Sequence, residues 1–323
     1  MRAFSGIKPS GELHLGSYFG AIRQWVEFQK NGEMICCIVD YHAITVPQKP
    51  DELRARTRML IATYLAAGID PIKNMIFIQS HVQGHTELGW IFNCLIRMSE
   101  LERMTQYKDK AIVKGENVSV GFFDYPALMA ADILLYDTDI VPVGHDQVQH
   151  VELACDVANR FNKTYGETFK IPKAVIQKVG ARVMSLDNPT EKMSKEHKNT
   201  VMLMDEADVI RKKVSRAMTD SLGTITYSKD RPGISNLIEI FHHATGREIP
   251  EIVASYAGKG YKEFKADLAE ALITMLAPIQ TKTKDYLDHP AKLDEILRDG
   301  AHRASVMAKA KLALIKDKVG FLA

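Results

Sequence analysis

Hydrophobic residues in the first half of the chain follow two alternating patterns. Short continuous apolar runs predict buried strands at residues 3–5, 34–39, 75–78 and 140–143. Apolar residues at helical spacing predict helices at about 15–29, 51–67, 87–98, 125–136 and 147–165. This alternation is typical of an α/β fold in which helices cover both faces of a parallel sheet. Because ligands bind beyond the carboxyl ends of such strands, the turns after Ser5, Val39 and Val143 are predicted to share one edge.

After about residue 185 the pattern becomes helical. Helices are predicted at 207–218, 234–245, 248–256, 263–286 and 291–319, with Gly and Pro between them. A chain of 323 residues exceeds the usual size of one hydrophobic core. The sequence therefore predicts an α/β domain with a parallel sheet plus a mostly helical second domain.

Composition narrows the class of protein. Apolar residues make up 46% of the chain and charged residues 25%, as in ordinary globular proteins. The net charge of +2, from 42 basic and 40 acidic residues, excludes a strongly basic nucleic-acid binder. It leaves room for a local binding surface at the basic cluster 211–216, although such a cluster can also be a solvated helix face. The four cysteines form no CxxC pair and predict reduced core residues. Without a signal peptide or a membrane-length apolar run, we expect a cytoplasmic enzyme with no membrane contact.

The first candidate for chemistry is the turn Pro9-Ser10-Gly11 with the following His14-Leu15-Gly16-Ser17. A glycine-rich turn that opens a helix presents backbone N–H groups to a phosphate, and an imidazole can donate to the same phosphate. The spacing of Gly6 and Gly11 is that of a P-loop, but Glu12-Leu13 stands where that motif has Lys-Ser/Thr, which disfavours a Walker-type NTPase. An ordinary turn and a surface histidine at a helix end are the alternatives.

The second candidate is Lys192-Met193-Ser194-Lys195, which lies in a polar stretch of the chain. Two lysines in such a loop suit a polyphosphate whose charge must be neutralised. The alternative is a solvated charged loop, the commoner meaning of such a string. In this order along the chain, the two candidates together indicate attack on the α-phosphate of ATP.

Two further segments place polar residues at positions that suggest a ligand: one at the end of a predicted strand and one inside an apolar helix. Gly144-His145-Asp146-Gln147 follows a predicted strand and opens a helix, so it suits a ligand, although Asp146 can also cap that helix. Asp132 lies inside an apolar helix, where a carboxylate must be paired with a ligand donor or with a buried Arg or Lys. Neither a metal-ligand spacing nor a Ser-His-Asp arrangement is recognisable, so no metal-binding residue is predicted.

Taken together, these residues resemble the class I aminoacyl-tRNA synthetases and, among them, the bacterial-type tryptophanyl branch. Phe4-Ser5-Gly6, Pro9-Ser10-Gly11 and Gly16 are similar to the family's HIGH region, and Lys192-Met193-Ser194-Lys195 to its KMSKS region. Further similarity lies at 37–45, 125–126, 128–136, 141–147, 180–186, 219–221 and 233–237. The resemblance spans nearly the whole chain in the family's order.

The resemblance implies a domain organisation and a reaction. It implies a Rossmann-like catalytic domain at 1–188, completed by a C-terminal helix at about 291–323, and a KMSKS loop with a helical anticodon-binding domain at 189–290. It also implies a homodimer that acts on tRNA(Trp). The tryptophan carboxylate would attack the α-phosphate of ATP, giving tryptophanyl-adenylate and pyrophosphate, and the terminal ribose of the tRNA would then attack the adenylate. Since a carboxylate needs no general base, such a site mainly aligns the reactants and stabilises charge.

The resemblance also implies roles for particular residues. The implied catalytic residues are His14, Lys192 and Lys195, assisted by Mg²⁺ that phosphate oxygens and water mainly hold. ATP would contact Lys8, Pro9, Ser10, Gly16, Ser17, Gly144, His145, Asp146, Val183, Lys192, Met193, Ser194, Lys195 and Glu196. Tryptophan would contact Phe4, Ser5, Gly6, His42, Met129, Asp132, Val141, Val143 and Gln147. Asp132 would accept the indole N–H, which rejects phenylalanine because the buried acceptor would stay unpaired.

Four residues depart from the family's pattern. Glu196 stands at the final Ser of KMSKS, Lys8 at a common Gln, and His145 at a common Glu. Ser17 stands at the last position of the first signature, which the tryptophanyl branch already varies. A carboxylate at position 196 should weaken the attraction for polyphosphate. We hypothesise that the cation at Lys8 partly compensates.

Three other functions compete with this one. A tyrosyl enzyme would need a phenol-reading site, against which the residues around Asp132 argue. A small-molecule nucleotidyltransferase fits the first signature but not the long helical second domain and its basic cluster. A non-catalytic paralogue that keeps tryptophan binding is supported by Glu196 and opposed by His14 and the two lysines. Adenylate formation distinguishes the paralogue from the enzyme.

Overall fold

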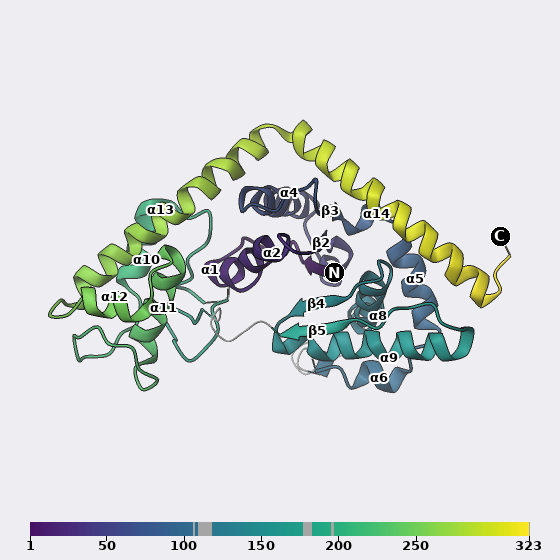
Figure 1. The fold of residues 1–323 in the computed structure, drawn as a ribbon, viewed down its shortest axis with the longest axis horizontal. Helices are drawn as coiled ribbons and strands as arrows, with labels where there is room; N and C mark the ends of the chain where they lie inside the picture. The colour runs from purple at the N-terminus through teal and green to yellow at the C-terminus, as the bar shows by residue number, and fades with distance from the viewer. Residues whose placement is uncertain (106, 109–117, 177–182, 195–196, 323) are drawn as a thin grey trace.

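A five-stranded parallel sheet forms the centre of the computed structural model, which describes residues 1–105, 107–108, 118–176, 183–194 and 197–322. The strands are β1 (Arg2–Ile7), β2 (Glu33–Ile38), β3 (Met75–Ile78), β4 (Ile140–Val143) and β5 (Lys173–Ile176), in the order β3-β2-β1-β4-β5 (Figure 1). This is a Rossmann-like order, and its topological switch point lies between β1 and β4. The predicted fold class is therefore confirmed.

The edge strand β5 is absent from the sequence prediction. It is four residues long, and Val175 and Ile176 are each 42% exposed. A short, half-solvated edge strand lacks the long apolar run that identifies β2, so periodicity does not reveal it.

Helices of the first half differ from the prediction mainly at their ends. They are α1 (Leu15–Ser17), α2 (Arg23–Phe28), α3 (Asp40–Ala43), α4 (Pro50–Ala66), α5 (Gly84–Asn93), α6 (Met98–Glu102), α8 (Val120–Leu134) and α9 (Val148–Tyr165). A π-helical turn, Tyr18–Ile22, divides the predicted 15–29 helix. The helix α8 begins earlier than predicted because the hydroxyl of Ser119 accepts the N–H of Phe122 as a cap, and the helix continues through Pro126.

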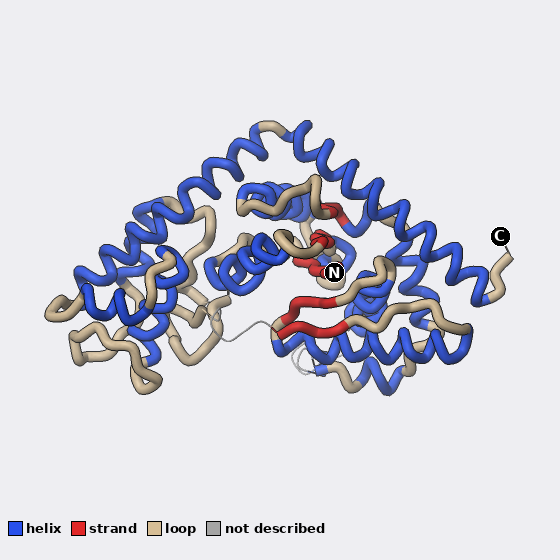
Figure 2. Tube along the Cα trace, viewed as in Figure 1, coloured by secondary structure: helices blue, strands red, loops and turns tan. Residues whose placement is uncertain are grey.

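The second half is helical, as the pattern predicts. Its helices are α10 (Ala207–Ser215), α11 (Pro232–Thr245), α12 (Ile249–Ser255), α13 (Tyr261–Asp288) and α14 (Pro290–Val319). Figures 1 and 2 show α13 and α14 as the two arms of an arch over the sheet, joined at His289-Pro290. The α13 arm packs on α4, α10 and α11, whereas the α14 arm packs on β3 and α5.

The hydrophobic core divides by face of the sheet. Along β2, Met34, Cys36 and Ile38 belong to one buried cluster, and Ile35 and Cys37 to the other, because successive side chains point to opposite faces. The first cluster continues into α10–α13, and the second takes in α5, α8, α9 and α14. The division of the chain into domains at 188 and 290 stays a prediction.

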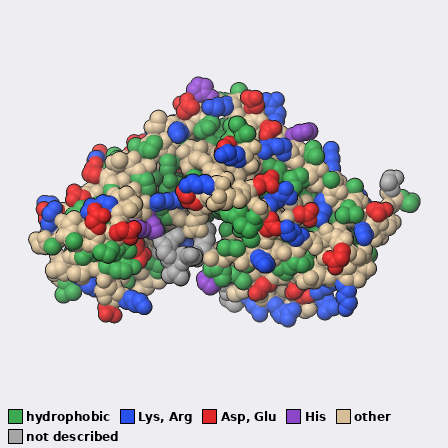
Figure 3. Space-filling model, viewed as in Figure 1, with side chains coloured by type: hydrophobic (Ala, Val, Ile, Leu, Met, Phe, Trp, Pro, Cys, Tyr) green, Lys and Arg blue, Asp and Glu red, His purple; other side chains and the backbone are tan. Residues whose placement is uncertain are grey.

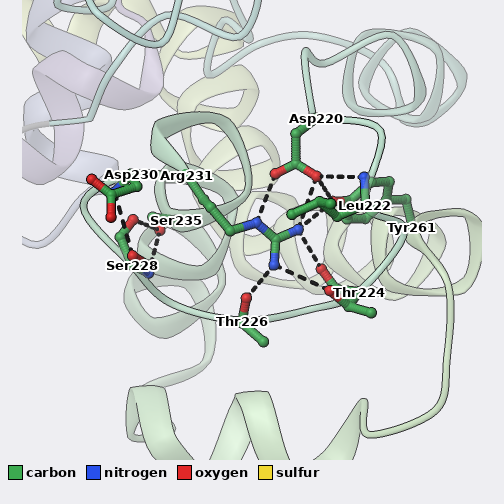
Figure 4. Close-up of polar contacts among 9 residues, drawn as sticks. All are labelled: Asp220, Leu222, Thr224, Thr226, Ser228, Asp230, Arg231, Ser235 and Tyr261. Atoms are coloured by element: carbon green, nitrogen blue, oxygen red, sulfur yellow. Dashed lines mark hydrogen bonds and ion pairs between the residues drawn. The ribbon is translucent and has the colours of Figure 1, made fainter.

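Polar contacts bind the loop between α10 and α11. In Figure 4 the guanidinium of Arg231 points at the carboxylate of Asp220, which accepts from Nε at 2.8 Å and from Nη2 at 2.9 Å. Arg231 also donates to the Thr224 carbonyl and to the Tyr261 hydroxyl of α13. This one side chain therefore ties the loop to α13.

The basic cluster at 211–216 is partly neutralised. Arg211 pairs with Asp208 and Glu270, and Lys213 pairs with Asp205 at 2.6 Å. On the face seen in Figure 3, acidic and basic side chains are mixed, and the surface is indented between the helical region and the ends of β4 and β5. No helix in the described part of the chain is long and apolar enough to cross a membrane.

Candidate active site

The turn after β1 delivers His14 to the start of α1. Its Nδ1 accepts the Ser17 N–H at 3.3 Å, and its Nε2 lies 3.1 Å from the Ser17 hydroxyl. The imidazole is thus an N-cap of the short helix and is half-buried. Because Nδ1 accepts a hydrogen bond, a neutral ring carries its proton on Nε2, which is the atom able to donate to a phosphate.

The two distant signatures are in contact. The N–H of Leu15 donates to the Val201 carbonyl at 3.0 Å, and the N–H of Leu203 donates to the Leu13 carbonyl at 2.8 Å. A Cβ placed on Gly16 would lie 3.3 Å from the Cβ of Met193 and about as close to the His14 ring. The glycine therefore permits the close approach of the 192–194 segment to the helix start.

Residues 192–194 are held by hydrogen bonds with Val183, which precedes them in the chain, and with Thr200, which follows them. The N–H of Met193 donates to the Val183 carbonyl at 3.0 Å, and the Asn236 side chain of α11 bonds both the N–H and the carbonyl of Met184. Val183 and Met193 are buried, whereas Lys192 is exposed. The Ser194 carbonyl accepts the Thr200 hydroxyl. Lys195, Glu196 and residues 180–182 lie outside the described residues.

At the end of β4, residues 144–147 lie beside the switch point. Asp146 is not the helix cap that the sequence allows, because its carboxylate accepts from the Gln147 side chain at 3.0 Å, and Gln147 itself occupies the N-cap of α9. A Cβ on Gly144 would lie 2.7 Å from Asp146 Oδ1, so a larger residue at this position would make the exposed Asp146 side chain move. His145 and Asp146 are exposed at this edge, and Lys8, Pro9 and Ser10 stand on the turn after β1.

Asp132, on α8, is 1% exposed and has three partners. Its Oδ1 accepts from Gln79 Nε2 at 2.7 Å and from His85 Nδ1 at 2.6 Å, and its Oδ2 lies 2.8 Å from His42 Nε2. A buried Arg or Lys as the partner is therefore wrong. Burial alone would raise the pKa of this carboxyl, but the hydrogen bonds from His42 and His85 outweigh it and lower the pKa below its usual value.

Apolar residues of the tryptophan set lie in one cluster. Phe4, Val141 and Val143 belong to it, and Met129 packs against it. The Phe4 ring stacks on Tyr136 with centroids 6.0 Å apart. Ser5 is 7% exposed and Gly6 is exposed at the end of β1, where a Cβ on Gly6 would lie 2.7 Å from Val39.

Sequence reasoning missed the other members of this network. Gln79 and His85 come from the turn and helix after β3, whereas Tyr136, just after α8, lies in the 128–136 segment that the resemblance already covers. Position was the available signal, since the carboxyl end of β3 meets the same sheet edge as the other strands. Within the described residues, no group of three or more His, Cys, Asp or Glu side chains is arranged to hold a metal ion.

Comparison with known proteins identifies the family. The model of class I tRNA synthetases for tryptophan and tyrosine matches residues 1–277. The tryptophan–tRNA ligase of Clostridium tetani is 50% identical over 322 residues, which cover 99% of this chain and 95% of that protein.

Two solved structures of tryptophanyl-tRNA synthetases are similar to this chain over nearly its whole length. Tryptophanyl-tRNA synthetase from Mycoplasma pneumoniae has a TM-score of 0.90 and 35% identity, with 99% of this chain and 98% of that chain covered. The enzyme from Campylobacter jejuni, complexed with ADP and tryptophan, has a TM-score of 0.89 and 38% identity, with 99% and 100% covered.

The chain belongs to the class I tRNA synthetases for tryptophan and tyrosine. Within that class it is a bacterial-type tryptophan–tRNA ligase. The tyrosyl, nucleotidyltransferase and non-catalytic alternatives are thereby set aside. The roles that the resemblance implies for individual ATP-binding and tryptophan-binding residues stay predictions.

Proposed function

We propose that Asp132 Oδ2 accepts the indole N–H of tryptophan, and this proposal rests on one observation. A carboxylate offers about four lone-pair sites. Among the residues that the structure describes, two donors occupy Oδ1 and one, His42, occupies Oδ2. The remaining acceptor site is therefore on Oδ2 of a charged, buried group.

The surrounding residues suit an indole and an amino-acid head group. Phe4, Met129, Val141 and Val143 would form the apolar walls. Ser5, Gly6 and Gln147 stand at the ends of β1 and β4, where the ammonium and carboxylate of the substrate would lie. Support comes from the Campylobacter relative, which was solved with tryptophan bound.

ATP would bind where the two signatures meet. His14, Gly16 and Ser17 open the helix, and Lys192 with Lys195 would neutralise the pyrophosphate. Mg²⁺ bound mainly to phosphate oxygens would add to this charge stabilisation. Support comes from the contact of Gly16 with Met193 and from the ADP bound by the Campylobacter relative.

The experiment is ATP–pyrophosphate exchange with two substrates. One is tryptophan, and the other is 3-benzothienylalanine, in which sulfur replaces the indole N–H. Asp132→Asn should lower kcat/KM for tryptophan by about 100-fold and for the analogue by far less, because a hydrogen bond to a charged group is lost only with tryptophan. An unchanged ratio of the two values would remove Asp132 from the recognition step, and tyrosine and phenylalanine serve as the non-substrates.

The compensation between Lys8 and Glu196 stays a hypothesis. Glu196 lies outside the described residues, so support comes only from the position of Lys8 on the turn after β1. Lys8→Gln should raise the KM for ATP in the exchange reaction. An unchanged KM would exclude the compensation.

Partners beyond the small substrates follow from the family. We propose that residues 189–290 contact the anticodon of tRNA(Trp), that the enzyme is cytoplasmic, and that two copies form a homodimer. The exposed apolar side chains of Trp90, Met98 and Val120, each more than 60% exposed on α5, α6 and α8, suit a second copy. A monomer in sedimentation at micromolar concentration would contradict the dimer.

A further inference from the structure

A chain of buried hydrogen bonds continues behind Asp132. His85 Nδ1 lies 2.6 Å from Asp132 Oδ1, and His85 Nε2 lies 2.8 Å from the Tyr136 hydroxyl. We propose that His85, with its tautomer fixed by Tyr136, is a positioning residue that determines which oxygen of Asp132 is left for the substrate. This inference deepens the proposed role of Asp132 and rests on it.

The protons in this chain can be assigned from acceptor chemistry. An ionised carboxylate only accepts hydrogen bonds, so His85 Nδ1 carries a hydrogen and donates it to Asp132. In a neutral ring, Nε2 then has no hydrogen and must accept, so the Tyr136 hydroxyl donates to it. Burial raises the pKa of Tyr136, which keeps the phenol protonated as this direction requires. Tyr136 therefore holds His85 in the tautomer that serves Asp132.

Packing fixes the orientation of both rings. His85 and Tyr136 are each 0% exposed. The Tyr136 ring stacks on the Phe4 ring, with centroids 6.0 Å apart and an interplanar angle of 10°. The centroid of the Phe77 ring lies 5.8 Å from that of His85 and 5.8 Å from that of Tyr136. Since Phe4 is a proposed wall of the indole site, Tyr136 supports both the wall and the acceptor of that site.

This arrangement has a consequence for selectivity. Gln79 and His85 together saturate Oδ1, so the remaining acceptor can only be on Oδ2. Without the His85 bond, Asp132 would have an open lone pair on Oδ1 and one fewer donor to hold it charged and oriented. We expect a loss of preference for substrates that carry an N–H, whereas the binding of ATP stays as before.

The test compares two tyrosine-to-phenylalanine variants. Tyr136→Phe keeps the ring stacked on Phe4 and removes only the donated hydroxyl. Tyr64→Phe is the matched control, because Tyr64 is also 0% exposed, but lies in the other core cluster with a hydroxyl that has no partner among the described residues. In ATP–pyrophosphate exchange, Tyr136→Phe should lower the ratio of kcat/KM for tryptophan to that for 3-benzothienylalanine by about 3- to 10-fold. Tyr64→Phe should leave the ratio unchanged.

Histidine variants test the donor itself. His85→Ala should lower the ratio by about tenfold or more, and His85→Asn, whose amide can occupy the position of Nδ1, should restore part of it. Equal losses for both substrates in Tyr136→Phe and His85→Ala would show a merely structural role and overturn the inference. If His85→Ala does not fold, Tyr136→Phe still decides, because it retains the packing.

Asp132→Asn distinguishes a failure of the proposed role of Asp132 from a failure of the positioning role of His85. If that variant leaves the substrate ratio unchanged, the proposed role of Asp132 falls, and the inference falls with it. If Asp132→Asn collapses the ratio while Tyr136→Phe and His85→Ala behave as the unaltered protein, the Asp132 role stands and only the positioning role is refuted.

Discussion

Burial sets the protonation of individual side chains near the proposed tryptophan site. His150, on α9, is 1% exposed, and its Nε2 lies 2.7 Å from the Tyr125 hydroxyl, with the two rings stacked. Burial lowers the pKa of His150 to about 4, although the nearby Asp146 carboxylate opposes the shift. The imidazole is therefore neutral at physiological pH, whereas Asp132 is kept charged by its donors.

This histidine predicts a dependence of stability on pH. An unfolded histidine titrates near pH 6.5, so between about pH 6.5 and 4 the unfolded chain binds a proton that the folded chain does not. The free energy of unfolding should thus fall as the pH drops through this range, by up to about 3 kcal/mol from this group. Above pH 6.5 the group contributes no such dependence.

Urea unfolding at several pH values measures the effect. The variant His150→Gln cannot take up the proton, so its free energy of unfolding should fall less steeply between pH 6.5 and 4 than that of the unaltered protein. Other groups titrate in both proteins and cancel in the comparison. Parallel curves for the two proteins would contradict the assignment.

At the scale of elements, the docking of α14 on the sheet depends on one glycine. A Cβ on Gly300 would lie 2.0 Å from the carbonyl oxygen of Ile76 in β3. That atom is backbone in the buried edge strand β3, which pairs with β2, so it cannot swing away as a flexible side chain would. The close approach of α14 and β3 thus requires glycine in the middle of a helix, where glycine normally costs stability.

Gly300→Ala should destabilise the protein by about 2 kcal/mol or more, because the clash exceeds the gain in helix propensity. Gly121 is the matched control, since it also lies in a helix but has nothing within 4 Å of its Cβ position. Gly121→Ala should be neutral or slightly stabilising. Thermal unfolding of both variants measures the difference, and similar melting temperatures would refute the close contact.

The elements also show the limit of periodicity. The predicted helix at 15–29 has the expected apolar spacing, yet a π-helical turn interrupts it where Gly20 lies. Apolar spacing predicts a helix that starts at about residue 125, but the cap at Ser119 places the start at Val120. Local caps and tertiary packing, rather than hydrophobic spacing, decide such boundaries.

For the whole molecule, α13 and α14 connect the helical region to both faces of the sheet. Near the C-terminal end of α14, Lys311 is 9% exposed and donates to the Asp137 carboxylate and to the Thr168 carbonyl at 2.6 Å. Its ammonium also lies 5.3 Å from the centre of the Phe169 ring. Asp137 has a positive φ of 51°, so the ion pair holds a turn that few side chains adopt.

Removal of this anchor should loosen the end of α14. Lys311→Met keeps the apolar stem but leaves the Thr168 carbonyl without its donor, at a cost of about 1–2 kcal/mol. Amide hydrogen exchange should accelerate in the last turns of α14 and not in α13. Lys309→Met, at an exposed position on the same helix, is the control. Equal exchange rates in the two variants would show that Lys311 does not anchor the helix.

The sequence by itself determined the α/β class, four of the five strands, the helical second half and the two signatures that identify the family. These depend on local periodicity and on residue types at fixed spacing, which a linear chain records. Only the tertiary structure decided that Gly16 meets Met193, and that Asp132 is paired with His42, Gln79 and His85 rather than with a buried cation. Partners of a buried polar group come from segments distant along the chain, and the pairing is set by packing that no local pattern encodes.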